Sequence, residues 1–309
     1  MERLEATPEN LTVGYFERGM TPAIEIESGD VIDIETATHW GGRVTPETTL
    51  EDVMRLRTVE FPGVGPHTLT GPVRVRGAKV GSVLKVDILE LDVIDFGFNL
   101  NFPGEMGTGL LPDFVTEGAL RVFDHDLERM ETKLGEGVTM PLRPFLGIMG
   151  VAPESPERIT TVPPGSHGGN IDLRELVAGT TLYLPVWEDG AQFFIGDAHS
   201  RQGNGEVCLT AIETAMKSAK LRLTVLDDLR LDGPMAETPE AWISMGLHSD
   251  LLEASRQAVR NMIELLGREY GLGVTDAYGL CSMMGDLSVT QVVNVTRGAH
   301  MSMPKAIFG

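Results

Sequence analysis

Cysteine is scarce in this sequence, and long apolar runs are missing from it. The 309 residues contain only Cys208 and Cys281, without CxxC spacing, which argues against a disulfide-stabilised secreted scaffold. No apolar run approaches the roughly 20 residues needed to cross a bilayer. Residues 1–7 lack the basic and apolar regions of a signal peptide. We therefore expect a cytoplasmic protein.

Basic residues are also few. Lys and Arg number 25 against 45 Asp and Glu, which gives a net charge of −20. Such a surface repels phosphate backbones and anionic lipids, so we expect neither nucleic acid nor a membrane as a partner. A small neutral or cationic ligand fits better. The chain has no Gly-x-Ser-x-Gly nucleophile elbow, so a serine-hydrolase mechanism has no support. It also has no P-loop and no dinucleotide-binding fingerprint.

Glycine and proline are plentiful, at 36 and 18 residues, and favour short strands joined by tight turns. Alternating or continuous apolar patterns predict strands throughout the chain. The expected strands are Ala23–Glu27 and Val31–Thr36 as a hairpin, Gly71–Ala78, Val83–Leu91, a buried strand within Pro141–Pro153, a second hairpin within 207–226, and Ser288–Val295.

One segment has clear helical spacing. Apolar residues recur with helical period from Leu251 to Tyr270, Asp250 and Glu253 resemble a capping box, and Gly271 occupies a C-cap position. Residues 97–115 are predicted to form a long loop, which its phenylalanines would order as a flap. No repeat or linker divides the chain. We expect a single domain, 1–309, of mainly β structure with some α (α+β).

The segment from Pro163 to Glu206 is the most informative part of the chain. It contains two glycine-rich stretches with metal-ligand side chains, 164–172 and 196–206, separated by the apolar run Thr181–Trp187. Glycine allows the backbone to approach a ligand closely and to take positive φ angles. The pattern predicts two loops that offer polar groups to one shared site.

These stretches supply candidate metal ligands, because neutral imidazole and carboxylate bind zinc and similar divalent ions. Asp197 and His199 are two residues apart and would share one face of a strand. The alternative for each histidine is a hydrogen bond to a carboxylate in a turn. The candidate ligands are His167, Asp172, Asp197 and His199.

Other residues nearby are candidates for proton transfer and substrate binding. Glu206 precedes an expected strand and could act as a general base, or instead form a salt bridge or cap a turn. Gln202 and Asn170 could donate hydrogen bonds to a carbonyl oxygen, or only brace their own loops. His39 and His67 are secondary candidates for a pocket wall. We assign catalysis to Glu206, His199 and Gln202, and substrate binding to Asn170, His39 and His67.

The chain resembles the acetamidase/formamidase family. The resemblance spans residues from about 20 to Phe308 and rests on motifs in a fixed order: Gly71-Pro72-Val73-x-Val75-x-Gly77-Ala78-x-x-Gly81, Pro144-Phe145-x-Gly147-x-x-Gly150-Val151-Ala152-Pro153, His167-Gly168-Gly169-Asn170-x-Asp172, Leu184-Pro185-Val186, and Gly196-Asp197-x-His199-x-x-Gln202-Gly203-x-Gly205-Glu206. It implies hydrolysis of a short-chain amide to ammonia and a carboxylate, a β-sandwich-like core with an added helix near 250–270, a homodimer and a divalent metal.

The leading hypothesis is a metal-assisted amidohydrolase for a small neutral amide of the formamide or acetamide class, with zinc favoured over calcium. One alternative is a metal-free amidase that uses Glu206 and Cys208, which would face the same side of a regular strand. Another is a non-enzymatic β-sandwich module with a structural ion. The chain departs from the family at Asn204, where aspartate is common, and at Ser200 and Arg201, where small residues are common. Arg201 would favour a substrate with a carboxylate or point to solvent.

Overall fold

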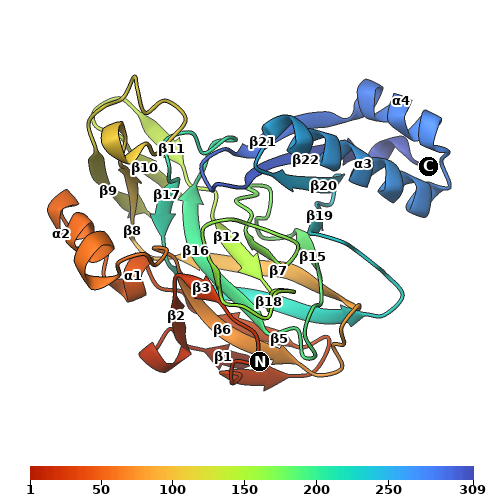
Figure 1. Ribbon diagram of the computed structural model, residues 1–309, viewed down its shortest axis with the longest axis horizontal. Helices are drawn as coiled ribbons and strands as arrows, with labels where there is room; N and C mark the ends of the chain where they lie inside the picture. Colours follow the sequence, from red (N-terminus) through yellow and green to blue (C-terminus); the bar gives the residue numbers. More distant parts are fainter.

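Two large β-sheets make up most of the computed structural model, which describes residues 1–309 (Figure 1). The first sheet has nine strands. In spatial order they are β1 (Glu2–Leu4), β5 (Val31–Ile34), β18 (Met216–Leu226), β7 (Val83–Val93), β15 (Thr181–Pro185), β19 (Met235–Glu237), β20 (Ala241–His248), β22 (Arg297–Pro304) and β21 (Asp286–Gln291).

The second sheet has eleven strands. Its main path is β11 (Thr139–Pro141), β10 (Glu131–Lys133), β9 (Ala119–Asp126), β8 (Phe96–Asn101), β17 (Ile212–Thr214), β16 (Phe193–Arg201), β12 (Phe145–Gly150) and β14 (Gly168–Asn170); β6 (Thr68–Val75) pairs with β16, β2 (Leu11–Val13) and β4 (Ile24–Ile26). A third, small sheet joins β3 (Tyr15–Phe16) and β13 (Ile159–Thr160).

The main hydrophobic core lies between the two large sheets. It is a cluster of 31 buried residues to which both sheets contribute, for example Val86 and Leu184 from the first and Val73, Leu146 and Ile195 from the second. Interdigitated apolar faces of two sheets are the packing of a β-sandwich. The expected mainly-β fold with some α is therefore confirmed.

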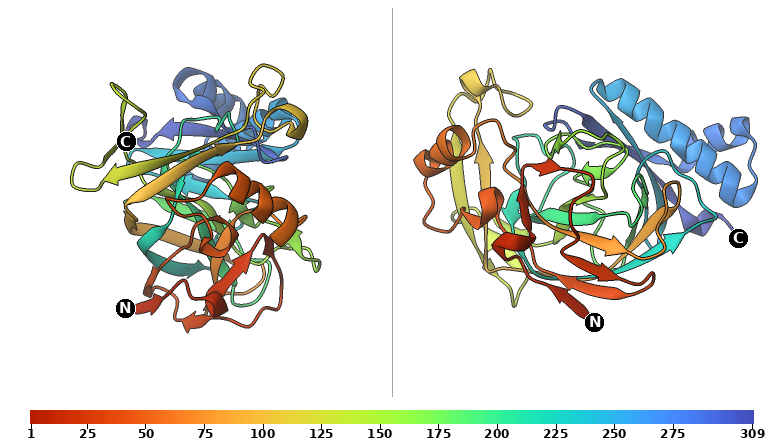
Figure 2. Two further views of the ribbon diagram at one scale, coloured as in Figure 1. Left: turned by 90° about the vertical axis from the view of Figure 1, so that its left-hand side faces the viewer. Right: turned by 60° about the horizontal axis from the view of Figure 1, so that its bottom comes forward.

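The C-terminal part adds two helices that lie together against the strands β20 and β22 (Figure 2). Helix α3 spans Leu251–Tyr270, as predicted. The Asp250 carboxylate accepts hydrogen bonds from the backbone N–H groups of Leu252 and Glu253, and Gly271 ends the helix in the left-handed region with φ 67°. No helix of the chain is both long and apolar enough to cross a membrane.

Helix α4 (Val274–Met284) was not predicted. Apolar residues occupy most of its positions, so its sequence has no polar face that would give a helical period. Two short helices, α1 (His39–Gly42) and α2 (Leu50–Arg55), lie beside β8 and β9 in Figure 1. Four short turns of other helix types complete the structure: Pro8–Asn10, Leu56–Glu60, Gly104–Met106 and Lys305–Ile307.

The predicted strands exist, but both predicted hairpins are wrong. Strand β4 pairs with β6 in the second sheet, whereas β5 pairs with β1 and β18 in the first. Likewise β17 belongs to the second sheet and β18 to the first, and residues 207–211 are not in a strand. Alternation shows which side chains of a strand are buried, but it does not identify the partner strand, and here the turn carries the chain from one sheet to the other.

Two further boundaries differ from the prediction. The expected loop 97–115 begins with strand β8, in which Phe98 is buried, so the irregular segment is 102–118. Phe102 packs inward, whereas Phe114 is 85% exposed, so the phenylalanines do not act together to order this loop. The expected strand Ser288–Val295 ends at Gln291 and turns before β22. The buried strand predicted within Pro141–Pro153 is confirmed as β12.

Candidate functional site

Adjacent strands of the second sheet position the candidate site. Strand β16 holds Asp197 and His199, and its neighbours β12 and β17 hold Gly147 and Glu213. The expectation that 196–206 is a loop is therefore wrong for its first half, because Gly196–Arg201 belongs to β16. Asp197 and His199 share one face of this strand, as the spacing of two residues predicted.

The imidazole of His199 lies at the centre of a group of buried carboxylates. Its Nε2 atom is 3.0 Å from Glu213 Oε2 and 3.5 Å from Asp197 Oδ2, and its Nδ1 atom is 3.9 Å from Asp172 Oδ1. All four side chains are almost fully shielded from solvent. A β-carbon added to Gly147 would lie 2.7 Å from Asp172 Oδ1 and from Asp197 Oδ2, so a glycine is required at this position.

Two histidines from a distant part of the sequence complete the group. The Nε2 atoms of His39 and His67 each lie 4.0 Å from Asp197 Oδ1, and the two rings meet edge to face at 5.3 Å. His67 Nδ1 is hydrogen-bonded to Thr161 at 2.9 Å, which directs its Nε2 atom toward the carboxylate. The sequence predicted both histidines as a pocket wall; the structure places them against Asp197.

Gln202 fixes the tautomer of His199. Its side-chain NH₂ donates to the backbone carbonyl of Asp172 at 2.9 Å, so its carbonyl oxygen faces His199 Nδ1, also at 2.9 Å. The Nδ1 atom must therefore donate a proton, which leaves the lone pair of Nε2 for a ligand. Gln202 therefore orients His199, and it is not among the residues that line the cavity described below.

Three of the site carboxylates come from strained backbone. Asp172, Asp197 and Glu206 have φ angles of 50°, 51° and 45°, in the left-handed region that side-chain-bearing residues rarely adopt. Each such residue costs about 1–3 kcal/mol, and strain of this kind clusters at active sites and ligand clamps. The carboxylates of all three residues converge on the same cavity.

The site concentrates negative charge, and no lysine or arginine pairs with its carboxylates. Four carboxylates are buried here, and the basic side chains within 4.0 Å of Asp172, Asp197 and Glu213 are all histidines. Burial raises the pKa of Asp172 and of Glu213 to about 7, and burial with the nearby Asp172 charge raises the pKa of Glu206 well above its ordinary value.

The remaining groups shift in both directions, because burial and the neighbouring charges compete. Burial alone would raise the pKa of Asp197, but His67, His199 and His39 outweigh it and lower the pKa. Burial likewise opposes the charge of His199, yet Glu213 and Asp197 raise its pKa well above the ordinary value, and a cation bound by these carboxylates would take the place of the Nε2 proton. Burial lowers the pKa of His39 and of His67 to about 4, so both are neutral near pH 7.

This donor set fits a divalent cation. Three overlapping groups each bring their ligand atoms within 4.8 Å of one another: His39, His67 and Asp197; Asp172, His199 and Glu206; Asp197, His199 and Glu213. Asp172 Oδ1, Asp197 Oδ1, His199 Nε2 and Glu213 Oε2 are buried without a hydrogen-bond partner. Buried polar atoms are almost always partnered, so four such atoms turned toward one another indicate a site for a cation.

The structure separates His167 from this group. Its ring packs edge to face against Phe16 at 4.9 Å, belongs to none of the three ligand groups, and has a pKa lowered to about 4 by burial. The sequence placed His167 among the metal ligands because its loop also supplies Asp172. In the structure, β14 lies between them, so His167 and Asp172 flank opposite ends of this strand and only Asp172 reaches the cluster.

Glu213 was missed by the sequence prediction, although a signal was present. It is the single charged residue of the stretch 207–216 and lies in the buried strand β17, where a carboxylate has a high cost unless it has a partner or a function. Asn294 was also missed: its side-chain NH₂ donates to Asp172 Oδ2 at 2.5 Å. It follows Gln291, which anchors the turn after β21 by accepting from the backbone N–H groups of Val293 and Asn294.

A small cavity opens onto this cluster. Its volume is about 190 Å³, and its lining includes His39, His67, Asp172, Asp197, Glu206 and Glu213 together with Asn170. The side-chain NH₂ of Asn170 donates to the carbonyl of Val162 at 3.1 Å, while its carbonyl oxygen is buried without a partner. Asn170 is therefore oriented to accept a hydrogen bond in the cavity, whereas the sequence suggested that it would donate one.

The geometry expected for a Glu206–Cys208 pair is absent. Residues 206–208 form a turn and not a regular strand, so the two side chains are not placed on one face. The Cys208 sulfur is 3.3 Å from the Asn99 side-chain nitrogen and donates to the carbonyl of Thr210, and Cys208 does not line the cavity.

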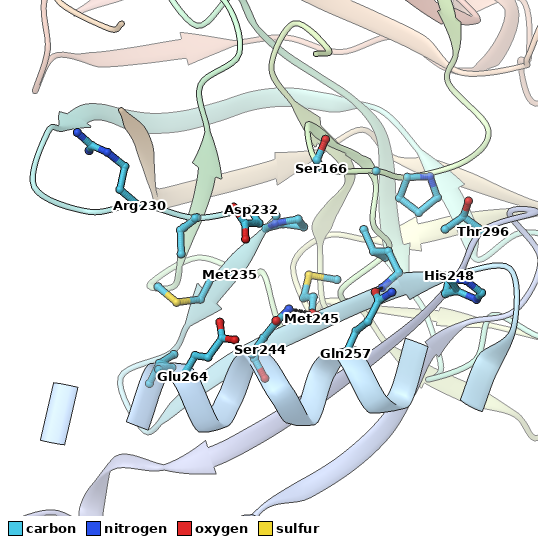
Figure 3. A pocket seen from close by; sticks show the side chains of 18 of the residues that line it. Ser166, Arg230, Asp232, Met235, Ser244, Met245, His248, Gln257, Glu264 and Thr296 are labelled. Atoms are coloured by element: carbon cyan, nitrogen blue, oxygen red, sulfur yellow. Dashed lines mark hydrogen bonds between the residues drawn. The ribbon is translucent and has the colours of Figure 1, made fainter. Parts of the chain in front are cut away.

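A larger cavity of about 760 Å³ lies elsewhere, between α3, the end of β20 and the segment 230–235 (Figure 3). Figure 3 shows Gln257 and Glu264 on the helix, and His248, Ser166 and Thr296 around the opening. It contains none of the carboxylate–histidine cluster, and Gln257 is already hydrogen-bonded to the backbone of Leu247. The smaller cavity is therefore the candidate active site.

A mainly-β fold with a buried carboxylate–histidine cluster defines a candidate metal centre, and comparison with known proteins identifies the family. The sequence profile of the Acetamidase/Formamidase family matches residues 9–158 and 155–309. The chain therefore belongs to this family, as the resemblance of its motifs predicted.

Solved structures agree over the whole chain. An acetamidase from Bacillus halodurans has a TM-score of 0.87 at 30% identity, covering 99% of this chain and 98% of its own. A predicted acetamidase/formamidase from Thermoanaerobacter tengcongensis has a TM-score of 0.88 at 31% identity, covering 99% and 96%. A formamidase of Methylophilus methylotrophus is 28% identical over 62% of this chain and 58% of its own length. The chain spans 58% to 64% of the length of the curated relatives that it matches.

Proposed function

We propose that this protein is an amidohydrolase that cleaves short-chain aliphatic amides, of the formamide or acetamide class, to ammonia and a carboxylate. The proposal rests on one observation: buried carboxylates and histidines with unpartnered ligand atoms converge on a cavity of about 190 Å³. Pockets for drug-sized ligands have volumes of about 300–1,000 Å³, so this cavity suits a substrate of only a few heavy atoms.

We propose a divalent cation as the cofactor, held by Asp172, Asp197, His199 and Glu213. His39 and His67, which lie against Asp197, would be further ligands of the cation. A cation bound there would polarise the amide carbonyl and acidify a water molecule. Three imidazoles in the donor set favour zinc over calcium, which binds oxygen ligands almost exclusively. In this proposal His199 binds through Nε2, because Gln202 keeps the proton on Nδ1.

Glu206 is the proposed proton carrier. It lines the cavity beside Asp172 and His199, and burial together with the nearby Asp172 charge raises its pKa. Hydrolysis of an amide requires a proton for the leaving nitrogen, because an amide anion is too basic to leave, and a carboxyl group with a raised pKa supplies it. In its carboxylate form Glu206 takes a proton from the attacking water, and the carboxyl group formed in this way donates that proton to the leaving nitrogen.

Asn170 is the proposed positioning residue for the substrate amide. Its unpartnered carbonyl oxygen accepts a hydrogen bond from the substrate NH₂ group, which turns the substrate carbonyl toward the carboxylate–histidine cluster. The walls around it are apolar at Leu100, Phe102 and Leu209, which excludes water from the reacting bond. Together these contacts favour a small substrate with a free amide NH₂ group.

The test is ammonia release from formamide, acetamide and propionamide by the purified protein. We expect release that a chelator abolishes and zinc restores, and a loss of about 100-fold or more in kcat for Glu206→Gln. Glu157→Gln, at an exposed glutamate outside the cavity lining, is the matched control and should retain the full rate. Undiminished activity of Glu206→Gln would remove the proton-carrier role, and chelator-resistant activity of metal-free protein would remove the metal.

We also propose a homodimer in the cytoplasm. Helix α4 is mostly apolar and exposes Val274, Tyr278 and Met283 by 73%, 62% and 73%, which supports a subunit contact there. The two cysteines are unpaired, which supports a reducing compartment. Light scattering on the purified protein tests the first point: a monomer at all concentrations, or an unchanged dimer in Tyr278→Asp, would contradict this interface.

A further inference from the structure

One positively charged side chain lines the small cavity together with the carboxylates. Of the 18 residues that line it, Arg57 is the only lysine or arginine. Its guanidinium carbon lies 5.4 Å from the centre of the Phe102 ring, which also lines the cavity, so stacking holds the side chain in place. The cavity therefore has a negative end at the carboxylate–histidine cluster and a fixed positive charge elsewhere on its wall.

The local backbone and the neighbouring ion pairs show that Arg57 is available to a ligand. It belongs to the turn Leu56–Glu60, which has π-helical hydrogen bonds, an uncommon conformation that occurs frequently at functional sites. Arg55 and Arg43, close to it in the structure, both pair with Glu60. Arg57 is half-buried and forms no such ion pair, although the protein has an excess of acidic residues.

We infer that Arg57 selects amide substrates that carry a carboxylate at the end opposite the amide. The inference rests on the proposed function and adds the substrate class to it. A guanidinium binds a carboxylate through two parallel hydrogen bonds, which are charge-assisted and stronger than neutral ones. The same contact fixes orientation, because the site carboxylates repel the anionic end of the substrate and leave the amide end facing them.

The sequence left two roles open for Arg201, a contact with a substrate carboxylate or a position in solvent. Arg201 does not line the cavity, so Arg57 is the arginine that a bound substrate meets. A cavity of about 190 Å³ suits a short chain between the two ends, and probes with one and two intervening carbons test it. Malonamate and succinamate are therefore the probes, and their neutral diamides, malonamide and succinamide, are isosteric controls.

The experiment compares kcat/KM for each anionic amide with that for its neutral diamide. We expect the unmodified protein to prefer the anionic member of at least one pair by about 10-fold or more. Arg57→Gln should lose about 10- to 100-fold on the anionic amide, the range of a lost charge-assisted hydrogen-bond pair, and less than about threefold on the diamide. Arg57→Lys should keep part of the preference, and Arg55→Gln, outside the cavity, should keep all of it.

The outcomes separate this inference from the proposed function. If acetamide and the diamides are hydrolysed but neither anionic amide is preferred, or if Arg57→Gln keeps the preference, the inference is overturned and the proposed function stands. If no amide is hydrolysed, the proposed function fails, and calorimetry with succinamate decides the inference. Binding that weakens in Arg57→Gln but not in Arg55→Gln supports it, and equal or absent binding overturns it.

Discussion

Replacing His167 by glutamine is expected to flatten the pH dependence of folding stability. His167 is buried against Phe16, and burial lowers its pKa from 6.5 to about 4. The folded protein disfavours the charged imidazole. His167 therefore does not reduce the free energy of unfolding above pH 6.5, and this free energy falls as the pH is lowered from 6.5 toward 4.

The magnitude follows from the two pKa values. The difference between the ordinary pKa of 6.5 and the pKa of about 4 in the folded protein corresponds to about 3 kcal/mol in the low-pH limit. At pH 5 the unfolded chain already binds most of this proton and the folded chain binds little, so about 2 kcal/mol is lost relative to pH 7.5. The side chain is 4% exposed, so solvent screening does not reduce this value appreciably.

Urea unfolding at pH 7.5 and pH 5, followed by circular dichroism, measures the effect. Between pH 7.5 and pH 5, the free energy of unfolding should fall by about 2 kcal/mol more in the unmodified protein than in His167→Gln. Both proteins are measured with chelator present, so that acid release of a metal contributes to neither difference. Equal losses in the two proteins would refute the reasoning, because they would show that His167 is not a neutral buried group in the folded state.

Three further predictions concern other parts of the structure. Gln202→Leu removes the acceptor for His199 Nδ1 and should weaken zinc binding about 10- to 100-fold in a competition titration; unchanged affinity would contradict the tautomer argument. Gly147→Ala places a methyl group 2.7 Å from two site carboxylates and should lower kcat about 100-fold with an unaltered circular dichroism spectrum. Leu266→Ala, in the fully buried face of α3, should cost about 2–5 kcal/mol in urea unfolding without changing kcat, and a changed kcat would show that α3 is coupled to the site.

The sequence predicted elements better than their pairing. Helix α3 has a polar face and caps at both ends, so its bounds were predictable, whereas α4 has few polar positions and was not. Strand β7 was found from its alternation. The partner of β4 could not be found in this way. Strand pairing within a sheet depends on contacts between residues far apart in sequence, such as Ile24 with Val73.

Most of the site residues found from the sequence lie close together in the chain. Asp172, Asp197 and His199 lie in glycine-rich motifs, and the structure brings them together. His39 and His67, from a distant part of the chain, were predicted only as a pocket wall. Glu213 reaches the same point from the next strand, β17, and a lone charge in an otherwise uncharged stretch was its only signal. His167 shares its motif with Asp172 but lies on the other side of β14, which residue types alone do not indicate.

The most direct test of the central claim measures metal and activity on the same sample. Purified protein is titrated with chelator, and at each step bound zinc is determined by elemental analysis and the rate of ammonia release from acetamide is recorded. The account predicts that the rate and the bound zinc fall in proportion and that added zinc restores both. Full activity in protein that contains no divalent metal would contradict it.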